Sequence, residues 1–106
     1  MNYILQLNGF RLRRRLCPIP MSAIALYYVI LENFNQVGFP DSLEIPIGIL
    51  AGELSTCDNT VRRARQELFD NGYIFYESGR QKHSAIYQLI DLDPRYFSVK
   101  MEDQVI

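Results

Sequence analysis

Residues 47–76 read IGILAGELSTCDNTVRRARQELFDNGYIFY, and this stretch decides the fold. Its first part carries apolar residues at helical spacing on one face, namely Ile47, Leu50, Ala51 and Leu54. Residues 55–59 form a polar break, rich in residue types that favour helix caps and turns. A second helix is predicted from about Asp58 to Asn71, where Gly72 permits the left-handed conformation that ends many helices. The pattern predicts a helix-turn-helix that leads into a strand.

The flanking segments extend this motif to a complete small fold. Residues 73–77 and 85–90 are rich in β-formers, and the polar, basic stretch 78–84 between them predicts a hairpin. Residues 43–45 predict a short strand before the motif, and Pro46 marks the start of its first helix. A hairpin directly after the second helix is the wing of a winged helix. We therefore expect an α+β winged helix-turn-helix with a three-helix core and a C-terminal hairpin.

Another helix is predicted from Pro20–Ser22 to about Asn35, with Ser22 as its cap. The run from Ala23 to Leu31 is apolar on every face, and such a helix is buried all round. A three-helix domain covers only one side of it. The other side therefore meets either a second subunit, which predicts a homodimer or higher homo-oligomer, or the N-terminal arm alone. The predicted interface residues are Tyr3, Ile4, Leu5, Leu7, Phe10, Leu26 and Ile30.

The 106 residues predict one domain, made of an arm and basic linker (1–19), a core (20–91) and a tail (92–106). The arm is too apolar for a solvated tail, and we expect a bend at Asn8-Gly9. Pro18 and Pro20 predict an extended connection. In the tail we expect Tyr96, Phe97 and Val99 to dock either on the core or on a partner. Residues 102–106 are expected to be loose.

Composition narrows the class of protein. With 48% hydrophobic and 22% charged residues the chain is an ordinary globular one. Its longest apolar run is far shorter than the roughly 20 residues of a membrane helix. No secretory signal is recognisable, and Cys17 and Cys57 lack metal-ligand spacing, so we expect a reduced, cytoplasmic protein. The net charge is −1, yet arginines and lysines cluster in three short stretches, and local charge matters more for attracting a polyanion.

The second motif helix predicts a DNA-reading face. On a helical wheel centred on Val61, three residues lie roughly opposite the buried side and Arg62 lies beside them. These three are Asn59, Arg63 and Gln66, whose side-chain types fit bidentate contacts with guanine or adenine. Thr60 completes the predicted recognition set. Arg65 lies near the buried face and is expected to reach a phosphate or a Glu with its head group.

Further basic residues predict contacts to the DNA backbone. In the wing these are Arg80, Lys82 and His83, the only histidine. Candidate phosphate contacts outside the wing are Arg11, Arg13, Arg14, Arg15 and Thr56. The arginine run has two readings, a solvated linker face or a phosphate grip. The sequence shows no catalytic or metal-binding constellation, because it has a single histidine and no phosphate-binding loop. We expect no enzyme activity, no cofactor, no metal, no membrane association and no small-molecule substrate.

The order of these features resembles the N-terminal winged-helix domain of DnaD-like phage replisome-organiser proteins. The likeness covers about residues 1–91 and is carried by five segments, Tyr3–Phe10, Ser22–Tyr27, Thr60–Leu68, Asn71–Ile74 and Ala85–Tyr87. It implies a self-associating domain that helps place a replicative helicase at an origin. Two features depart from the family. Cys57 stands where a capping Ser is usual. The family's second, helicase-loading domain has no counterpart in these 106 residues, so we expect either a piece of a longer protein or a stand-alone remnant that only binds.

The sequence thus predicts a sequence-specific, double-stranded DNA-binding domain of a phage or prophage replication-initiation protein. A helicase or helicase loader is the further partner that the resemblance implies. Two alternatives stay open. One is a winged-helix transcriptional repressor. The other is a DNA-independent module for protein interaction or oligomerisation, which the acidic residues Asp58 and Asp70 beside the motif favour.

Overall fold

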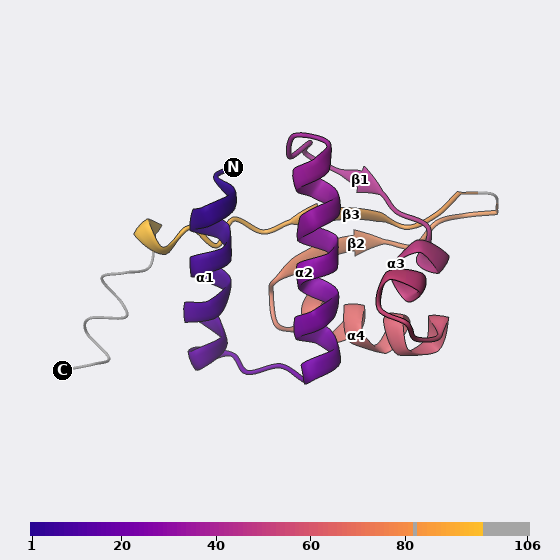
Figure 1. The fold of residues 1–106 in the computed structure, drawn as a ribbon, viewed down its shortest axis with the longest axis horizontal. Coiled ribbons are helices and arrows are strands. Elements are labelled where there is room, and N and C mark those ends of the chain that lie inside the picture. The colour runs from indigo at the N-terminus through magenta and orange to yellow at the C-terminus, as the bar shows by residue number, and fades with distance from the viewer. Residues whose placement is uncertain (82, 97–106) are drawn as a thin grey trace. The chain divides into compact units, whose positions relative to one another are not determined.

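A computed structural model of the chain describes residues 1–81 and 83–96 (Figure 1). The chain divides into two compact units, each treated by itself below. The larger is Ile19–Ile90, and the smaller joins Met1–Pro18 to the segment that starts at Asp91. Within the described residues the fold is α+β, with four α-helices and a three-stranded antiparallel sheet.

The larger unit contains the elements that the sequence predicted. Its helices are α2 (Met21–Gln36), α3 (Ile47–Glu53) and α4 (Asp58–Asp70). Its strands are β1 (Leu43–Glu44), β2 (Ile74–Glu77) and β3 (Ile86–Leu89). One detail was wrong. The N-cap of α2 is Pro20, and no side chain caps this end, so Ser22 lies inside the helix and is not its cap.

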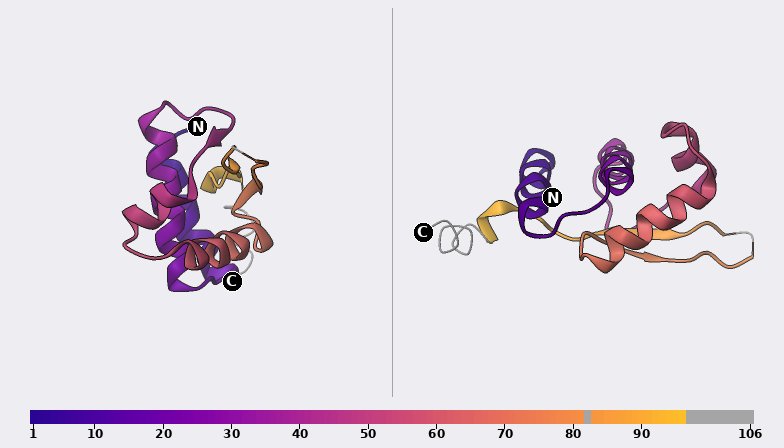
Figure 2. Two further views of the ribbon diagram at one scale, coloured as in Figure 1. Left: turned by 90° about the vertical axis from the view of Figure 1, so that its right-hand side faces the viewer. Right: turned by 90° about the horizontal axis from the view of Figure 1, so that it is seen from below.

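The three strands lie in the order β1-β3-β2, and both pairings are antiparallel. Tyr87 on β3 faces Leu43 on one side and Tyr76 on the other, so β3 is the central strand. Strands β2 and β3 form the predicted hairpin directly after α4. In two views of the ribbon this hairpin extends past the end of α3 (Figures 1 and 2).

Turn geometry fixes both ends of α4. Residues between α3 and α4 turn through Ser55, which has a positive φ of 53°, and the Thr56 N–H donates to the Ala51 carbonyl at 2.9 Å. At the other end Gly72 has a φ of 76°, and the Tyr73 N–H donates to the Leu68 carbonyl at 2.9 Å. The predicted glycine stop is therefore confirmed.

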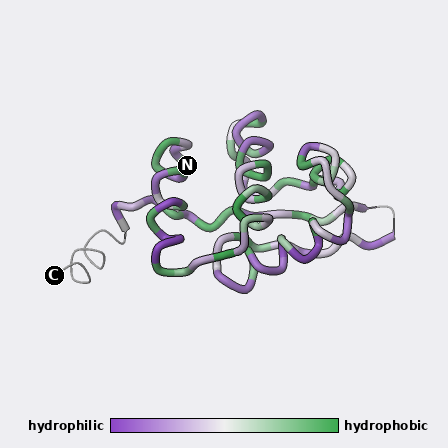
Figure 3. Tube along the Cα trace, turned by 60° about the horizontal axis from the view of Figure 1, so that its bottom comes forward, coloured by the Kyte–Doolittle hydropathy of each residue, from purple (hydrophilic) through white to green (hydrophobic). Residues whose placement is uncertain are grey.

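Helix α2 packs on α4 and α3 in the larger unit. Tyr27 on α2 meets Tyr73 edge to face, with ring centroids 6.3 Å apart, and both rings are fully buried. Along α4, hydrophilic positions recur turn by turn (Figure 3, purple), as expected of a helix with one buried face. The buried positions of α4 are Val61, Ala64 and Leu68.

Burial corrects part of the predicted dimer interface. Residues 23–31 of α2 are buried or half-buried within a single chain, so their apolar character is no evidence for a second subunit. Phe10, Leu26 and Ile30 are fully buried and offer no surface to a partner. Of the other predicted interface residues, Tyr3, Leu5 and Leu7 are half-buried and only Ile4 is exposed. Self-association itself stays a prediction.

The smaller unit contradicts the predicted bent arm and linker. Residues 3–16 form one continuous helix, α1 (Tyr3–Leu16), which runs through Asn8-Gly9 and the arginine run. The side chain of Asn2 caps it by accepting the Leu5 N–H at 3.1 Å. The Asn-Gly pair was misread as a bend because turn propensity is weaker than a capped, continuous helix with tertiary packing.

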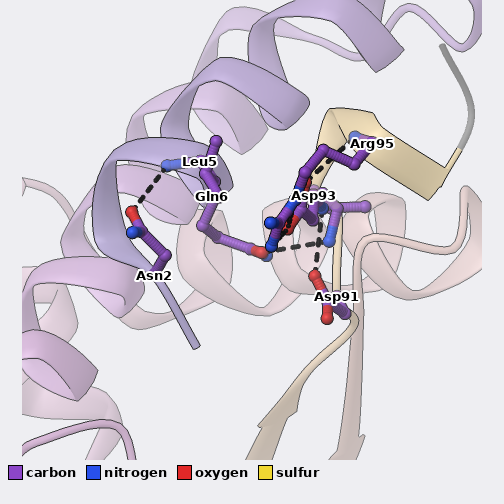
Figure 4. A network of polar contacts seen from close by, with 7 residues as sticks. Asn2, Leu5, Gln6, Asp91, Asp93 and Arg95 are labelled. Atoms are coloured by element: carbon purple, nitrogen blue, oxygen red, sulfur yellow. Dashed lines mark hydrogen bonds and ion pairs between the residues drawn. The ribbon is translucent and has the colours of Figure 1, made fainter.

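Gly9 is required for packing and not for a turn. A β-carbon at this position would overlap the backbone carbonyl of Leu92. One helical turn earlier, the buried side chain of Gln6 accepts the Leu92 N–H at 3.0 Å. Leu92 is fully buried, so the described segment 91–96 is fixed against α1 at Leu92 by close backbone approach and by a buried hydrogen bond (Figure 4).

A short 3-10 helix, η1 (Pro94–Tyr96), follows. Asp91 accepts the Asp93 N–H at 3.0 Å, and Asp93 accepts the Arg95 N–H at 2.9 Å, so two aspartate turns lead into η1 (Figure 4). Asp91 and Asp93 therefore lie in a loop before η1. The predictions for Phe97, Val99 and residues 102–106 lie outside the described residues, as does the side chain of Tyr96. None of the described helices has the length and apolarity needed to cross a bilayer.

Candidate nucleic-acid interface

The predicted reading residues lie together on the exposed side of α4. Asn59, Arg62, Arg63 and Gln66 are all exposed, and the opposite face of the helix is buried. Both arginines lie in the N-terminal half, the end where the helix dipole is positive. Three exposed acidic residues also lie on α4: Asp58, Glu67 and Asp70. The basic character of this face is therefore concentrated in the first two turns after the cap.

Two of the four reading residues are already paired within the helix, and a third is held by two partners. Arg62 donates to the Asn59 side-chain oxygen at 2.9 Å. Gln66 donates to the Asp70 carboxylate at 2.8 Å and accepts from the Tyr76 hydroxyl at 2.6 Å. Arg63 has no hydrogen-bond or ion-pair partner among residues 1–81 and 83–96. Its guanidinium is the one in this set with all its donors free for a ligand.

Arg65 differs from its sequence-based prediction. Its guanidinium donates to the Tyr87 hydroxyl at 3.1 Å and lies 4.6 Å from the centroid of the Tyr76 ring. Its Nε is buried and has no hydrogen-bond partner in the described part of the chain. The residue therefore joins α4 to the sheet by a cation–π contact and one hydrogen bond, and it pairs with no Glu of residues 1–81 or 83–96.

The N-terminus of α4 lacks a side-chain cap, as expected for Cys57. The Cys57 sulfur lies 3.3 Å from the Thr60 hydroxyl. This hydrogen bond, with help from backbone groups of the first turn, lowers the pKa of the exposed Cys57 thiol.

Thr56 and Thr60, both half-buried, line a small pocket of about 160 Å³ between α2 and α4. The Thr56 backbone N–H closes the turn before α4, so the predicted phosphate contact of Thr56 falls to its half-buried side chain and stays a prediction.

The hairpin loop is held at its base by a residue that the sequence did not single out. Glu44 on β1 accepts the Ser84 N–H at 2.8 Å and lies 3.7 Å from Nδ1 of His83. A β-carbon on Gly79 would overlap the His83 carbonyl, so the loop closes tightly on itself. Arg80 and His83 are exposed, and the predicted wing contact Lys82 lies outside the described residues.

The arginines of the smaller unit lie on α1 and not in a linker. Arg11 and Arg15 are exposed, four residues apart on one side of the helix. Arg13 and Arg14 are half-buried, and the Arg14 guanidinium lies 4.7 Å from the centroid of the Phe10 ring. Only Arg11 and Arg15 therefore present free surface suited to a phosphate.

The outer face of the sheet carries an apolar patch that sequence reasoning missed. Phe75 is 54% and Ile86 41% exposed, and both border a groove of about 200 Å³. Phe69 on α4 meets Phe75 edge to face at 6.3 Å. Side chains alternate between the two faces of the sheet along β2 and β3, and this places Phe75 and Ile86 on the outer face. The alternation could have been read from the sequence.

Among the described residues no three His, Cys, Asp or Glu side chains gather as a metal site would require. Comparison of the chain with family models, with curated proteins and with solved structures found no match. The resemblance to DnaD-like replisome organisers therefore stays a prediction from the sequence.

Proposed function

We propose that this chain is a winged-helix domain that binds double-stranded DNA through α4. The observation that supports this most is the exposed face of α4, where Arg62 and Arg63 lie in the N-terminal half beside Asn59. Recognition helices enter the major groove with their N-terminal residues against base edges. The strand order β1-β3-β2 and a hairpin directly after α4 fit the winged-helix arrangement.

In this proposal the two arginines have different tasks. Arg63, with no partner in the described chain, contacts guanine directly, and one good bidentate contact gives about 1–3 kcal/mol of discrimination. Arg62 and Asn59 are already hydrogen-bonded to each other, so they act as a unit or exchange their bond for one to a base. Arg80 on the hairpin loop contacts phosphate beside the groove.

A salt titration tests the proposal. Binding of the chain to a random duplex is followed by fluorescence anisotropy between about 50 and 200 mM salt, where neutralised phosphates give a steep negative slope of log K against log salt. We expect a slope of several units. Absence of binding at the lowest salt, or binding with a flat slope, would refute the DNA-binding function.

The replication role rests on the sequence resemblance alone. Footprinting separates it from the repressor alternative, since repeats within an origin support replication initiation and a promoter operator supports repression. Recruitment of a helicase or helicase loader follows only in the first case.

One observation favours a second candidate, a module for self-association without DNA. The groove on the outer face of the sheet has a mixed lining, with exposed Phe75 and Ile86 beside Glu77, and α1 exposes Ile4 together with Arg11 and Arg15. Apolar and charge complementarity make a second copy of the chain the occupant that fits. Sedimentation velocity tests this. Phe75→Glu should convert an oligomer to a monomer, and a chain that is monomeric from the outset would exclude the candidate.

A further inference from the structure

Tyr76 lies next to the exposed face of α4 and is held by several contacts. Its ring lies 5.5 Å from Phe69, edge to face, and 6.2 Å from Tyr87, the residue opposite it on β3. The Arg65 guanidinium covers it at 4.6 Å. Contacts from α4 and from β3 therefore fix the ring, and with it the position of the hydroxyl.

That hydroxyl fixes the amide of Gln66. The Asp70 carboxylate only accepts hydrogen bonds, so the amide nitrogen of Gln66 is the atom that faces it, at 2.8 Å. The amide oxygen consequently faces Tyr76, whose hydroxyl donates at 2.6 Å. These two hydrogen bonds remove the torsional freedom of the Gln66 side chain and select one of its two amide orientations. One N–H and one oxygen lone pair of Gln66 stay available to a ligand.

We propose that Gln66 reads an adenine in the major groove and that Tyr76 is its positioning residue. This inference rests on the proposed DNA-binding function. A donor beside an acceptor matches the N7 acceptor and N6 donor of adenine, whereas guanine presents two acceptors and suits Arg63. A glutamine side chain that rotates freely loses conformational entropy on binding, and this weakens its contact with adenine. The Tyr76 hydroxyl fixes the side chain before binding and so avoids that loss.

The spacing of Arg63 and Gln66 on α4 gives the expected site. Three residues correspond to a rise of about 4.5 Å along the helix. Stacked base pairs are about 3.4 Å apart. Guanine and adenine should therefore occupy neighbouring or nearly neighbouring base pairs. The alternative is that the Tyr76–Gln66–Asp70 contacts only join β2 to α4 and have no part in recognition.

The test begins with selection of bound duplexes from a randomised pool by the wild-type chain. Binding is then measured for the selected duplex, for substitutions at each adenine, and for 7-deazaadenine, which lacks the N7 acceptor. We expect wild type to prefer adenine at one position by about 5- to 150-fold. Gln66→Ala should abolish this preference. Tyr76→Phe should reduce it by about 2- to 10-fold while binding to random duplex stays unchanged.

Tyr87→Phe is the matched control, because it removes a hydroxyl of the same cluster that bonds to Arg65 and not to Gln66. It should keep the adenine preference. If Tyr76→Phe does not fold, Asp70→Ala releases the amide from its other side and should have the same effect. The proposal is overturned if Gln66→Ala keeps the preference, or if Tyr76→Phe and Tyr87→Phe change it equally. Absence of wild-type binding to any duplex would instead refute the DNA-binding function.

Discussion

Gly9 of α1 and the backbone carbonyl of Leu92 are in such close contact that no side chain fits between them. The contact joins positions 83 residues apart in the sequence. It forms because α1 carries no β-carbon at Gly9. The Gln6 side chain adds a hydrogen bond by accepting the Leu92 N–H. Because the contact is between backbone atoms, neither partner can move away by a rotamer change.

Gly9→Ala should therefore detach residues 91–96 from α1. Alanine is the better helix former by about 1 kcal/mol, but overpacking costs about 1–3 kcal/mol, and backbone overlap lies at the upper end of that range. We expect faster amide hydrogen exchange at Leu92 and a net loss of about 2 kcal/mol in the local free energy of unfolding.

Gly52→Ala is the matched control for that substitution. Gly52 is also helical, and nothing lies within 4 Å of a β-carbon built on it. Alanine at this position should stabilise the chain by about 0.5–1 kcal/mol. Unchanged protection of Leu92 in Gly9→Ala would show that the contact between α1 and this segment does not hold.

Asp93 should titrate below the usual range of an aspartate. Its pKa is lowered by the Arg95 side chain, whose Nη2 lies 2.6 Å from the carboxylate Oδ2, and also by the Arg95 backbone N–H. The folded pKa is therefore below the unfolded one. The pair contributes stability at neutral pH, and this is lost as the pH falls through the folded pKa. Carbon-detected NMR titration should show the low pKa in wild type and a higher one in Arg95→Gln. Equal pKa values in both would contradict the pairing.

Cys57 should react with an alkylating reagent at a lower pH than an ordinary thiol. The hydrogen bond with the Thr60 hydroxyl lowers its pKa, so more of the thiolate is present near neutrality. We expect Thr60→Val to shift the pH profile of the alkylation rate upward. The measurement is made on a Cys17→Ser background, so that one thiol is observed. A profile that does not change in Thr60→Val would show that this hydrogen bond does not form in solution.

Arg63→Ala should weaken binding to a selected duplex more than binding to a random one. The expected loss of discrimination is about 1–3 kcal/mol, since the guanidinium has no partner within the described chain to compensate. Arg95→Ala is the control with the same change in charge, because Asp93 already holds its guanidinium. Equal losses on both duplexes would reassign Arg63 to a phosphate contact.

Hydrophobic periodicity was sufficient to predict the larger unit. The apolar stripe through Val61 and Leu68, the glycine at 72 and the two β-rich segments are local signals, and the structure follows each of them. The smaller unit was not predictable in this way. Asn8-Gly9 has a strong local turn signal, and only the approach of a distant backbone explains why a glycine lies inside α1.

The candidate site was predictable only in part, because local sequence signals identify exposed positions but not tertiary contacts. A helical wheel identifies which side chains of α4 are exposed, and Asn59, Arg62, Arg63 and Gln66 are. It cannot identify which of them are already hydrogen-bonded. The partner of Gln66 is Tyr76, ten residues later on a strand, and the loop is anchored by Glu44, forty residues before Ser84. Both pairings depend on tertiary packing and leave no periodic signal in the sequence.

Chemical-shift mapping with ¹⁵N-labelled chain and a duplex tests DNA binding through α4 most directly, because it locates the contact surface residue by residue. We expect the largest amide shift changes at Asn59, Arg62, Arg63 and Gln66, with smaller ones at Arg80 and His83 in the hairpin loop. Changes confined to Phe75 and Ile86 on the outer face of the sheet, or no changes at saturating duplex, would contradict it.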